Sequence, residues 1–566
     1  MTRREAWLTA LGIFVVALAV RVAAAAAIEF PRPEDTAYYV GVARNLVEGR
    51  GLVSDALWSY GTPPLVFPRP AFEVWLPLPS LLFALPLGFS GVHASIPLET
   101  AMRASQLVTA LLGALLAVLA WRLAADLAEE RRLPRGRART LAIGAGLTAG
   151  VYLPLVLHSA QPDSTIVFGV LAVGGCLLMT RVLRDPRQAR VSDPRLVGLG
   201  LLVGAAALTR NEAVWLGLTW AWLAWRLRNV PRADRLRLIA IVAVISLVVF
   251  APWAARNWAV FGSPLPGQAA ANALSIRAED VFAWNDPPTL ARYLAVGPVE
   301  LFGMRVAGLT HNLFNVLLLL GIPLALVGLV ALPWQGRDRS LRPLVILAGT
   351  TFLVTSLVFP VSTTWGTFLH AAAPIHVLLI VSALGALDGG FARLSGRMGW
   401  TRPVAWLGAV LAVGGSLLFS VALLPLTAKN AQETALRYEV LSRELAAQGL
   451  PLDGTAPVIH DFPIWLAETQ RIPTLALPYE TPSDVLDLAT DPRFHARLLI
   501  AVVDDDNDWP QVLDGSTDPA AACFQEVTLP VPPDPAEAKA IADVRVFRIT
   551  CDAVPVAAAT LTRRWT

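Results

Sequence analysis

Long apolar stretches, separated by short polar connections, follow one another from the start of the chain to about residue 424. A transmembrane helix needs about 20 apolar residues, and about eleven stretches approach or reach that length. Two of them, residues 196–208 and 213–225, are short and would need help from flanking residues or from local thinning of the bilayer. The pattern predicts a polytopic α-helical membrane protein with spans near residues 7–28, 104–127, 140–157, 164–183, 196–208, 213–225, 238–253, 306–333, 343–359, 367–387 and 403–424.

One further apolar segment, residues 71–91, does not fit a straight span. It contains Pro77, Pro79 and Pro86, and proline inside a helix removes a hydrogen bond and bends the chain. If this segment crossed the membrane, every later connection would change side. We therefore expect an interfacial or re-entrant helix within a long first outer loop, residues 29–103.

The arginines alternate between successive connections. Residues 131–139, 184–190, 228–237, 337–342 and 393–402 each hold at least three arginines, whereas the turns at 158–163 and 362–366 hold none. By the positive-inside rule the arginine-rich connections and the N-terminus are cytoplasmic, and the other turns face outward. The first stretch follows Arg3 and Arg4, is too long for a signal peptide and lacks a convincing small-residue cleavage site, so it is expected to be a retained helix of a multi-pass cell-membrane protein.

The chain changes character after residue 424. From about residue 430 it is soluble in composition, with short apolar runs bounded by proline. Residues 456–460, 497–503 and 544–549 are typical of strands, and residues 431–448 and 463–469 of helices. We therefore predict two domains: a membrane domain at residues 1–428, and a small extracytoplasmic α/β domain at residues 429–566.

Composition and charge exclude some classes of protein. The chain is 55% hydrophobic and 16% charged, and its net charge is +3 without a basic stripe, so nucleic acid is not an expected partner. The three cysteines have no metal-ligand spacing. Cys523 and Cys551 either form a disulfide or remain two buried thiols, and the sequence leaves both open.

Acidic residues at the outer membrane boundary are the first candidates for chemistry. Glu34 and Asp35 follow Pro33 after the first apolar stretch. Acidic residues stabilise the first turn of a helix; alternatively, Asp35 acts as a general base that accepts a proton from an attacking hydroxyl. Asp163 follows Pro162 and allows the same two interpretations, with the second carboxylate completing an acid/base or acceptor-binding site.

Two arginines on the outer side are candidates for binding phosphate. Arg210 and Glu212 share a tight turn and either form an ion pair or leave Arg210 free for a phosphate, which its fork of donors suits. Arg256 is either an interfacial anchor or a second phosphate ligand. Trp253 and Trp258 beside it are typical of the aromatic belt at a membrane interface.

Two histidines lie near the tenth predicted span. His370 and His376 are six residues apart, whereas a metal-binding pair on one helix is normally three or four apart, so no metal site is predicted from them. His376 is expected to be a hydrogen-bonded core residue. The sequence identifies no certain cofactor and leaves metal dependence open, because Asp35 and Asp163 could share a divalent cation.

Several segments together resemble a known family. The sequence DTAYY at residues 35–39, ARNL at 43–46 and EGRG at 48–51, after a first span, resembles the first outer loop of GT-C glycosyltransferases. The group it resembles most is glycosyltransferase family 39 with its bacterial relatives, which include protein O-mannosyltransferases and lipid A aminoarabinose transferases. The segment at residues 252–266 is similar to another recurring feature of the bacterial members. The resemblance covers roughly residues 7–425 and agrees with the topology expected from charge.

The resemblance implies a sugar donor on a polyprenyl monophosphate and inversion at the anomeric carbon. It implies that Asp35 is the general base, that Arg256 and Arg210 hold the donor phosphate, and that Asp163 orients the acceptor. One departure is that better-known members often have an Asp-Glu pair where this chain has Glu34-Asp35. Either carboxylate could be the base, although the alignment of the tyrosines favours Asp35. Further candidate site residues are Glu212, Asn257, His370, Tyr38 and Tyr39.

The sequence therefore favours a membrane glycosyltransferase whose partners are the lipid bilayer, a polyprenyl-phosphate sugar and a lipid, protein or glycan acceptor. The alternative is a flippase or transporter for lipid-linked sugars without transferase activity. Transporters usually show repeated halves or charges deep within their spans, whereas the candidates here gather at one face. A receptor or scaffold with a membrane anchor would not need about eleven spans.

Overall fold

The computed structural model describes residues 2–91, 94–185, 193–400, 404, 406–503 and 509–552. It divides into two compact units. The first, called the helical unit, comprises Met1–Leu52, Ala71–Ala278 and Thr289–Gln432; the second, called the sheet unit, comprises Val53–Pro70, Glu279–Pro288 and Glu433–Thr566. This division corrects the predicted single boundary at residues 428/429, because two segments from earlier in the chain are part of the sheet unit.

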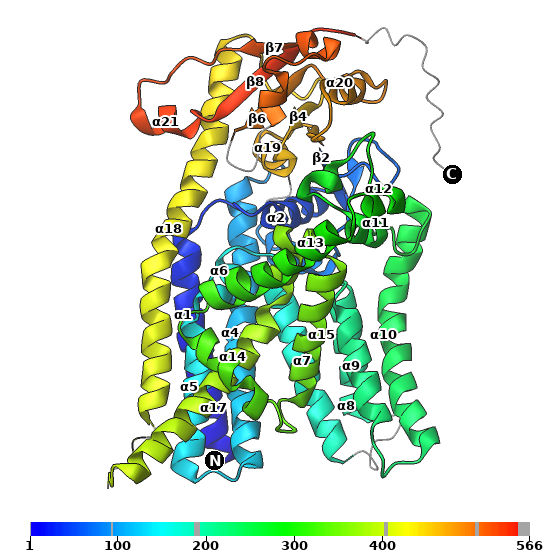
Figure 1. Ribbon diagram of the computed structural model, residues 1–566. Coiled ribbons are helices and arrows are strands. Elements are labelled where there is room, and N and C mark those ends of the chain that lie inside the picture. The colour runs from blue at the N-terminus through cyan, green and yellow to red at the C-terminus, as the bar shows by residue number, and fades with distance from the viewer. Residues whose placement is uncertain are drawn as a thin grey trace. The chain divides into compact units, whose positions relative to one another are not determined.

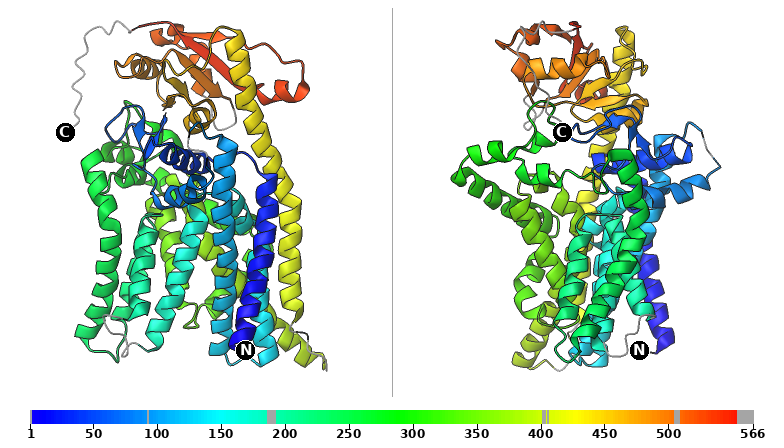
Figure 2. Two further views of the ribbon diagram at one scale, coloured as in Figure 1. Left: turned by 180° about the vertical axis from the view of Figure 1, so that it is seen from behind. Right: turned by 90° about the vertical axis from the view of Figure 1, so that its right-hand side faces the viewer.

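The helical unit is built from long helices, several of which run in roughly the same direction (Figure 1), with α2 across one end of them (Figure 2). Its helices are α1 (Arg3–Ala27), α2 (Glu34–Val47), α3 (Leu78–Gly88), α4 (Leu98–Glu130), α5 (Arg135–Val151), α6 (Leu153–Ala160), α7 (Ser164–Arg184), α8 (Pro194–Ala207), α9 (Ala213–Trp225), α10 (Arg232–Phe261), α11 (Ala269–Leu274), α12 (Leu290–Ala295), α13 (Pro298–Thr310), α14 (Leu324–Gln335), α15 (Arg342–Val358), α16 (Thr367–Ala371), α17 (Ala373–Arg397) and the first part of α18 (Trp406–Ala447).

Six helices among the described residues are long and apolar enough to cross a membrane: α1, α4, α7, α10, α17 and α18. The pair α5 and α6, bent by 45°, and the pair that ends in α14, bent by 115°, raise the number to eight if each pair is one span. A polytopic helical membrane protein is therefore confirmed. The predicted number of about eleven also needs α8, α9 and α15, which at 1.5 Å per residue are about 20–26 Å long against a hydrocarbon core of about 30 Å. That number stays a prediction.

Two expected spans differ from straight helices. Residues 306–333 fold as α13 and the π-helix His311–Leu319, followed after a sharp bend by α14. Residues 140–157 are interrupted at Tyr152.

The helix within residues 71–91 is α3, with 11 residues and Pro86 inside it. It is about 16 Å long, so it is too short to cross a bilayer, which agrees with its predicted placement in the outer loop.

The sheet unit contains the α/β fold that was expected near the end of the chain. Its six-stranded sheet has the order β2-β5-β4-β6-β8-β7, and the first three pairings are parallel while the last two are antiparallel. A two-stranded ladder pairs β1 (Val53–Ser54) with β3 (Arg69–Pro70). The strands are β2 (Ala56–Leu57), β4 (Val458–His460), β5 (Thr474–Ala476), β6 (Leu498–Val502), β7 (Phe524–Val527) and β8 (Val544–Ile549), with helices α19 (Pro463–Gln470), α20 (Pro482–Thr490) and α21 (Pro535–Ala540).

The predicted strands at β4, β6 and β8 and the predicted helix α19 are confirmed. The predicted helix at residues 431–448 is also confirmed, but it does not begin there: it is the end of α18, which runs for 42 residues from Trp406 with Pro425 inside it. The composition changes because the expected surroundings of the helix change from lipid to water. The helix itself continues, because its backbone hydrogen bonds form in either environment.

Specific backbone contacts hold the two earlier segments in the sheet unit. β2 forms the edge of the sheet beside β5. In the segment Glu279–Pro288, the amides of Trp284 and Asn285 donate to the carboxylate of Glu480 over 2.8 and 2.9 Å, and the indole nitrogen of Trp284 donates to Asp487 over 2.9 Å. The strand pairing of β2 and the hydrogen bonds to Glu480 and Asp487 depend on position and not on apolar pattern, so composition gave no sign of them.

The structure decides between the two alternatives for the cysteines. Cys523, which directly precedes β7, is bonded to Cys551, 28 residues later, just after β8. The remaining cysteine, Cys176, is buried as a free thiol in α7. The disulfide therefore joins the ends of two neighbouring antiparallel strands.

Removing this disulfide will destabilise the sheet unit. Closure of a 28-residue loop removes conformational entropy from the unfolded chain, so Cys523→Ala together with Cys551→Ala should lower the free energy of unfolding by about 3–4 kcal/mol. The measurement is thermal unfolding with and without a reductant. The reductant should lower the Tm of the wild type and of the Cys176→Ala control, and leave the double variant unchanged. A wild-type Tm that does not respond to full reduction would contradict the pairing.

Candidate functional site

The site begins at the first turn of α2. Pro33 precedes the helix, and the acidic residues Glu34 and Asp35 occupy its first turn, which fits the favourable interaction of carboxylates with a helix N-terminus. Every residue from Thr36 to Asn45 is buried, so α2 is a rigid internal element. The Asp35 side chain, which is 23% exposed, lies at the end of this buried helix.

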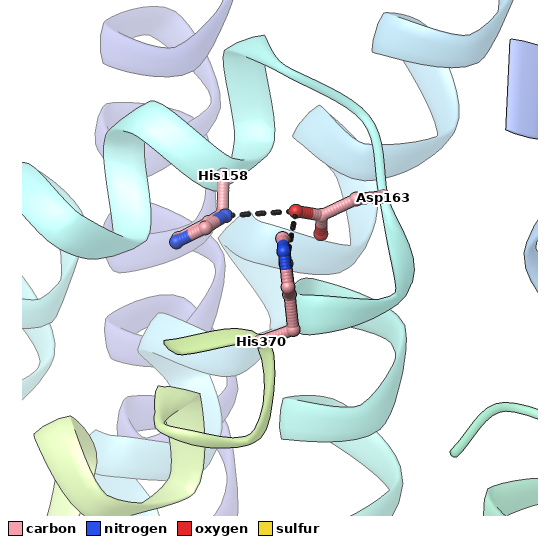
Figure 3. A group of neighbouring side chains, drawn as sticks. All are labelled: His158, Asp163 and His370. Atoms are coloured by element: carbon pink, nitrogen blue, oxygen red, sulfur yellow. Dashed lines mark hydrogen bonds and ion pairs between the residues drawn. The ribbon is translucent and has the colours of Figure 1, made fainter. Parts of the chain in front are cut away.

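A buried carboxylate joins two histidines near Asp35. Oδ2 of Asp163 lies 2.9 Å from Nδ1 of His158 and 2.9 Å from Nδ1 of His370 (Figure 3). Oδ1 of Asp163 accepts a hydrogen bond from the amide of Thr165 over 2.6 Å and thereby caps α7. The helix-start role and the site role expected for Asp163 are thus compatible, because each uses a different oxygen.

His370 connects this cluster to α2. Its Nε2 lies 3.1 Å from Oδ2 of Asp35, while its Nδ1 faces Asp163. The side chains therefore form a continuous chain: Asp35, His370, Asp163, His158. These residues come from α2, α16, the start of α7 and α6, which are far apart in the sequence.

Burial and charge act in opposite directions on these groups. Burial alone would raise the pKa of the Asp163 carboxyl, but the two histidines outweigh it, so the pKa lies well below its usual value. Burial alone would lower the pKa of His370, but the charges of Asp35 and Asp163 outweigh it and raise that pKa. Both shifts favour a carboxylate at Asp163 and, as long as no metal ion occupies its Nδ1, a protonated imidazole at His370.

Among the described residues, His158, Asp163 and His370 also form a group able to hold a metal ion, with one ligand atom from each within 4.8 Å of the others. Imidazole nitrogens and a carboxylate suit zinc and similar divalent ions. A ligand histidine normally donates its second ring N–H to a carboxylate, and Asp35 occupies that place for His370. The residues therefore fit such an ion.

This geometry differs from the sequence analysis in two respects. His158 was not predicted as a site residue, although it lies five residues before Asp163 in a turn that was expected to face outward. A cation shared directly by Asp35 and Asp163 is not what the arrangement offers, because His370 lies between them. His376, by contrast, is buried with Nδ1 3.4 Å from the hydroxyl of Tyr152, as predicted for a core histidine.

Arg210 forms the ion pair that was one of its two interpretations. Its Nε and Nη2 donate to the two oxygens of Glu212, each over 3.0 Å. Its Nη1 donates to the Ser164 hydroxyl over 2.9 Å, and Nη2 also donates to the Thr367 carbonyl over 3.0 Å. Ser164 and Thr367 are the first residues of α7 and α16. Arg210 therefore joins the two elements that carry Asp163 and His370.

Arg256 lies in different surroundings. Its Nη1 donates to the Ala71 carbonyl over 2.9 Å and to Oδ1 of Asn257 over 3.2 Å. Its guanidinium lies 4.8 Å from the ring centre of Trp253 and 5.2 Å from that of Phe261. Among the described residues, its Nε and Nη2 have no hydrogen-bond partner and it forms no ion pair with a carboxylate. A cation held between aromatic rings with open donors is suited to an anionic ligand.

The two tyrosines of α2 contact different parts of the site. The hydroxyl of Tyr38 accepts a hydrogen bond from the amide of Phe72 over 2.7 Å. Phe72 packs against Trp253 at 5.7 Å between ring centres, so Tyr38 leads towards Arg256. Tyr39 is fully buried, and burial together with the charge of Asp35 raises the pKa of its hydroxyl. Through these two side chains α2 contacts the surroundings of both Asp35 and Arg256.

Comparisons with known proteins identify the fold. No family model and no characterised protein matches the sequence. Among solved structures, the chain resembles ArnT from Cupriavidus metallidurans bound to undecaprenyl phosphate, with a TM-score of 0.51 and 14% identity over 97% of this chain and 99% of that one. It also resembles the oligosaccharyltransferase AglB from Archaeoglobus fulgidus in complex with an inhibitory peptide and a dolichol-phosphate, with a TM-score of 0.50 and 11% identity over 93% and 73% of the two chains.

These proteins are glycosyltransferases of the GT-C fold. The fold implied by the resemblance at residues 7–425 is therefore confirmed, and it extends over nearly the whole chain, because the match to ArnT includes 97% of it. At 11–14% identity the likeness establishes the fold. What the site does has to be argued from its own residues.

Proposed function

We propose that this chain is an integral-membrane glycosyltransferase that transfers a sugar from a polyprenyl-phosphate donor to an acceptor at the outer face of the cell membrane. The observation that carries the proposal is the contact of Asp35, at the end of α2, with the buried His370–Asp163 pair. The solved structures of similar fold contain undecaprenyl phosphate or dolichol-phosphate, which supports a lipid-phosphate donor.

Asp35 is the general base of the proposed reaction. Its Oδ2 faces His370, and Oδ1 has no hydrogen-bond partner among the described residues, so this oxygen is available to the acceptor. The acceptor hydroxyl gives its proton to Asp35 as its oxygen forms a bond to the anomeric carbon. The bond from that carbon to the phosphate oxygen breaks on the opposite face, and the electron pair leaves with the polyprenyl phosphate. Attack and departure on opposite faces invert the anomeric configuration.

His370 and Asp163 fix the orientation of the base. A carboxylate held at one oxygen by Nε2–H of a buried imidazole ring has little rotational freedom, so its second oxygen points in a defined direction. Asp163, which is 1% exposed, holds the other side of the imidazole in the same way. In this scheme Asp163 acts through His370 and does not contact the acceptor, which replaces the acceptor-orienting role that the resemblance implied.

Arg256 is assigned to the donor phosphate, as the resemblance implied. Its open Nε and Nη2 donors match the two non-bridging oxygens of the donor phosphodiester. The positive charge stabilises the phosphate as the sugar leaves, and it does so more strongly where water is scarce. Arg210 is not assigned to the phosphate, because Glu212, Ser164 and Thr367 already occupy its Nε, Nη1 and Nη2.

The disulfide supports the expected orientation. Disulfides persist in oxidising compartments, and Cys523–Cys551 lies in the sheet unit. An outward sheet unit agrees with the arginine pattern, which gives a cytoplasmic N-terminus and an extracytoplasmic C-terminal part. The proposed site, in the connections with few arginines, then faces outward as well.

A divalent cation is proposed as an auxiliary component of this site. His158, Asp163 and His370 would hold it through their Nδ1 and Oδ2 atoms; it would take the place of the Nδ1 proton of His370, and the neutral imidazole would keep its Nε2–H for Asp35. Removal of divalent ions with EDTA should then lower turnover, and zinc or manganese should restore it. Turnover that survives exhaustive chelation would show that the three side chains rely on their mutual hydrogen bonds alone.

Replacing the base should abolish transfer and leave donor binding intact. Asp35→Asn keeps the shape and removes the proton acceptor, so kcat should fall by about 10²–10⁴-fold. The measurement is sugar release from polyprenyl-phosphate sugars by purified protein, with donor binding measured in parallel. The matched control is Glu34→Gln, one residue away, which should lose far less. Equal losses would reopen the choice between the two carboxylates, and full activity of Asp35→Asn would show that Asp35 is not the base. Donor binding without any sugar release by the wild type would favour a transporter.

Arg256 and Arg210 should respond differently to the same substitution. Arg256→Gln removes a charged contact to the phosphate, so KM for the donor should rise by about tenfold or more. Arg210→Gln leaves the buried Glu212 carboxylate without its partner, so the free energy of unfolding should fall by about 3–5 kcal/mol. Thermal unfolding in detergent and donor titration separate the two effects. A higher donor KM in Arg210→Gln, at unchanged stability, would return Arg210 to the phosphate site.

A further inference from the structure

One arginine lies at membrane depth and takes no part in the site described above. Arg21 is in the second half of α1, a candidate membrane span, and is 0% exposed. It forms no ion pair with a carboxylate in the described part of the chain. A buried charge of this kind is costly, so its retention needs a reason other than general stability.

The hydrogen bonds of Arg21 converge on the break between α5 and α6. Its Nη1 donates to the Gly150 carbonyl over 2.8 Å, and its Nη2 to the Ala149 carbonyl over 3.1 Å. α5 ends at Val151, and Pro154 lies in the first turn of α6, so the last carbonyls of α5 lose their helical partners. Arg21 replaces two of those partners where no water would do so.

Side chains from other helices donate hydrogen bonds to further carbonyl groups at the ends of α5 and α6. The hydroxyl of Ser420, in α18, donates to the Val151 carbonyl over 2.6 Å. At the far end of α6, Thr109 donates to the Ser159 carbonyl over 2.7 Å, and Gln106 to the Ala160 carbonyl over 2.8 Å. The eight-residue helix α6 is thus held at both ends by side chains and not by continuation of the helix.

Arg21 also contacts α6 itself, one residue from the site. Its Nε donates to the Ser159 hydroxyl over 3.1 Å, and His158, the neighbour of Ser159, lies 2.9 Å from Asp163. Gly113 in α4 makes room for this contact, because a Cβ atom there would lie 2.3 Å from Nε of Arg21 and 2.4 Å from Oγ of Ser159. A larger residue at 113 would therefore displace both partners.

We propose that Arg21 is a positioning residue: its guanidinium bonds to the broken end of α5 and to Ser159, and so fixes the direction in which α6 presents His158 to Asp163. The role in turnover rests on the proposed function, since Asp163 orients Asp35 through His370. The structural part, that the charge of Arg21 holds the α5–α6 break, stands independently of any activity.

The test compares three variants with a matched control. Arg21→Met removes the donors, Arg21→Lys keeps the charge but offers one ammonium in place of the fork, and Gly113→Ala keeps Arg21 but pushes it from Ser159. The control is Gly12→Ala, also in α1, where a Cβ atom would meet nothing within 4 Å. The readouts on the full-length protein in detergent are hydrogen exchange at residues 153–160, kcat and donor KM.

In Arg21→Met and Gly113→Ala, the amides of residues 153–160 should exchange about tenfold faster or more, while α7 and α17 keep their protection. kcat should fall by up to about 10²-fold, as expected for a small displacement of an orienting group, while donor KM changes by less than about threefold. Arg21→Lys should fall between these variants and the wild type, and Gly12→Ala should match the wild type.

Unchanged exchange at residues 153–160 in Arg21→Met would overturn the inference, and so would a uniform loss of protection across the helical unit, which would reveal only general packing. If the wild type has no transferase activity, the proposed function fails while the exchange experiment still decides the role of Arg21 at the break. If exchange rises locally and kcat is unaffected, the link from α6 to the reaction is overturned.

Discussion

A charged group inside an apolar bundle is stable only if its hydrogen-bonding atoms are satisfied by other polar groups, and the proposed site is built around one such group. Asp163 is 1% exposed, yet its two oxygens meet Thr165, His158 and His370. This single carboxylate caps α7, orients two imidazoles and, through His370, reaches Asp35. The relative placement of α2, α6, α7 and α16 depends on it.

The arginines around the site divide into those that hold structure and one that is left for a ligand. Arg210 uses its guanidinium on Glu212, Ser164 and Thr367, which joins α7 to α16. Arg21 does the same between α1 and the α5–α6 break. Arg256 alone among these three keeps Nε and Nη2 without hydrogen bonds in the described part of the chain. Arginine is always charged, so whether it can bind an anionic ligand depends on how many of its N–H donors already have partners.

The sheet unit is built partly from segments that lie between the helices of the helical unit in the sequence. It contains β2 from the loop between α2 and α3 and the segment Glu279–Pro288 from the connection between α11 and α12. Glu480 collects the backbone amides of the second segment. Both connections that leave the helical unit and return to it therefore contribute to the sheet unit, and each is anchored there by backbone hydrogen bonds.

The sequence by itself determined the features that come from local pattern. The apolar lengths gave a polytopic helical protein, and the strand-like runs gave β4, β6 and β8. The resemblance at residues 35–51 gave the GT-C fold and selected Asp35, because these signals lie within short segments. Asp163, Arg210 and Arg256 were selected by their positions at the predicted outer boundary, and His370 was included without a role.

Only the tertiary structure decided which of these side chains meet. The Asp35–His370–Asp163–His158 chain joins residues up to 335 positions apart, so no local period encodes it. The same holds for the arginines: in sequence Arg210 and Arg256 were equivalent phosphate candidates, and Arg21 was one charge in an apolar run. Their roles differ because hydrogen-bond partners are set by packing between distant helices, and the sequence specifies those contacts only through the complete fold.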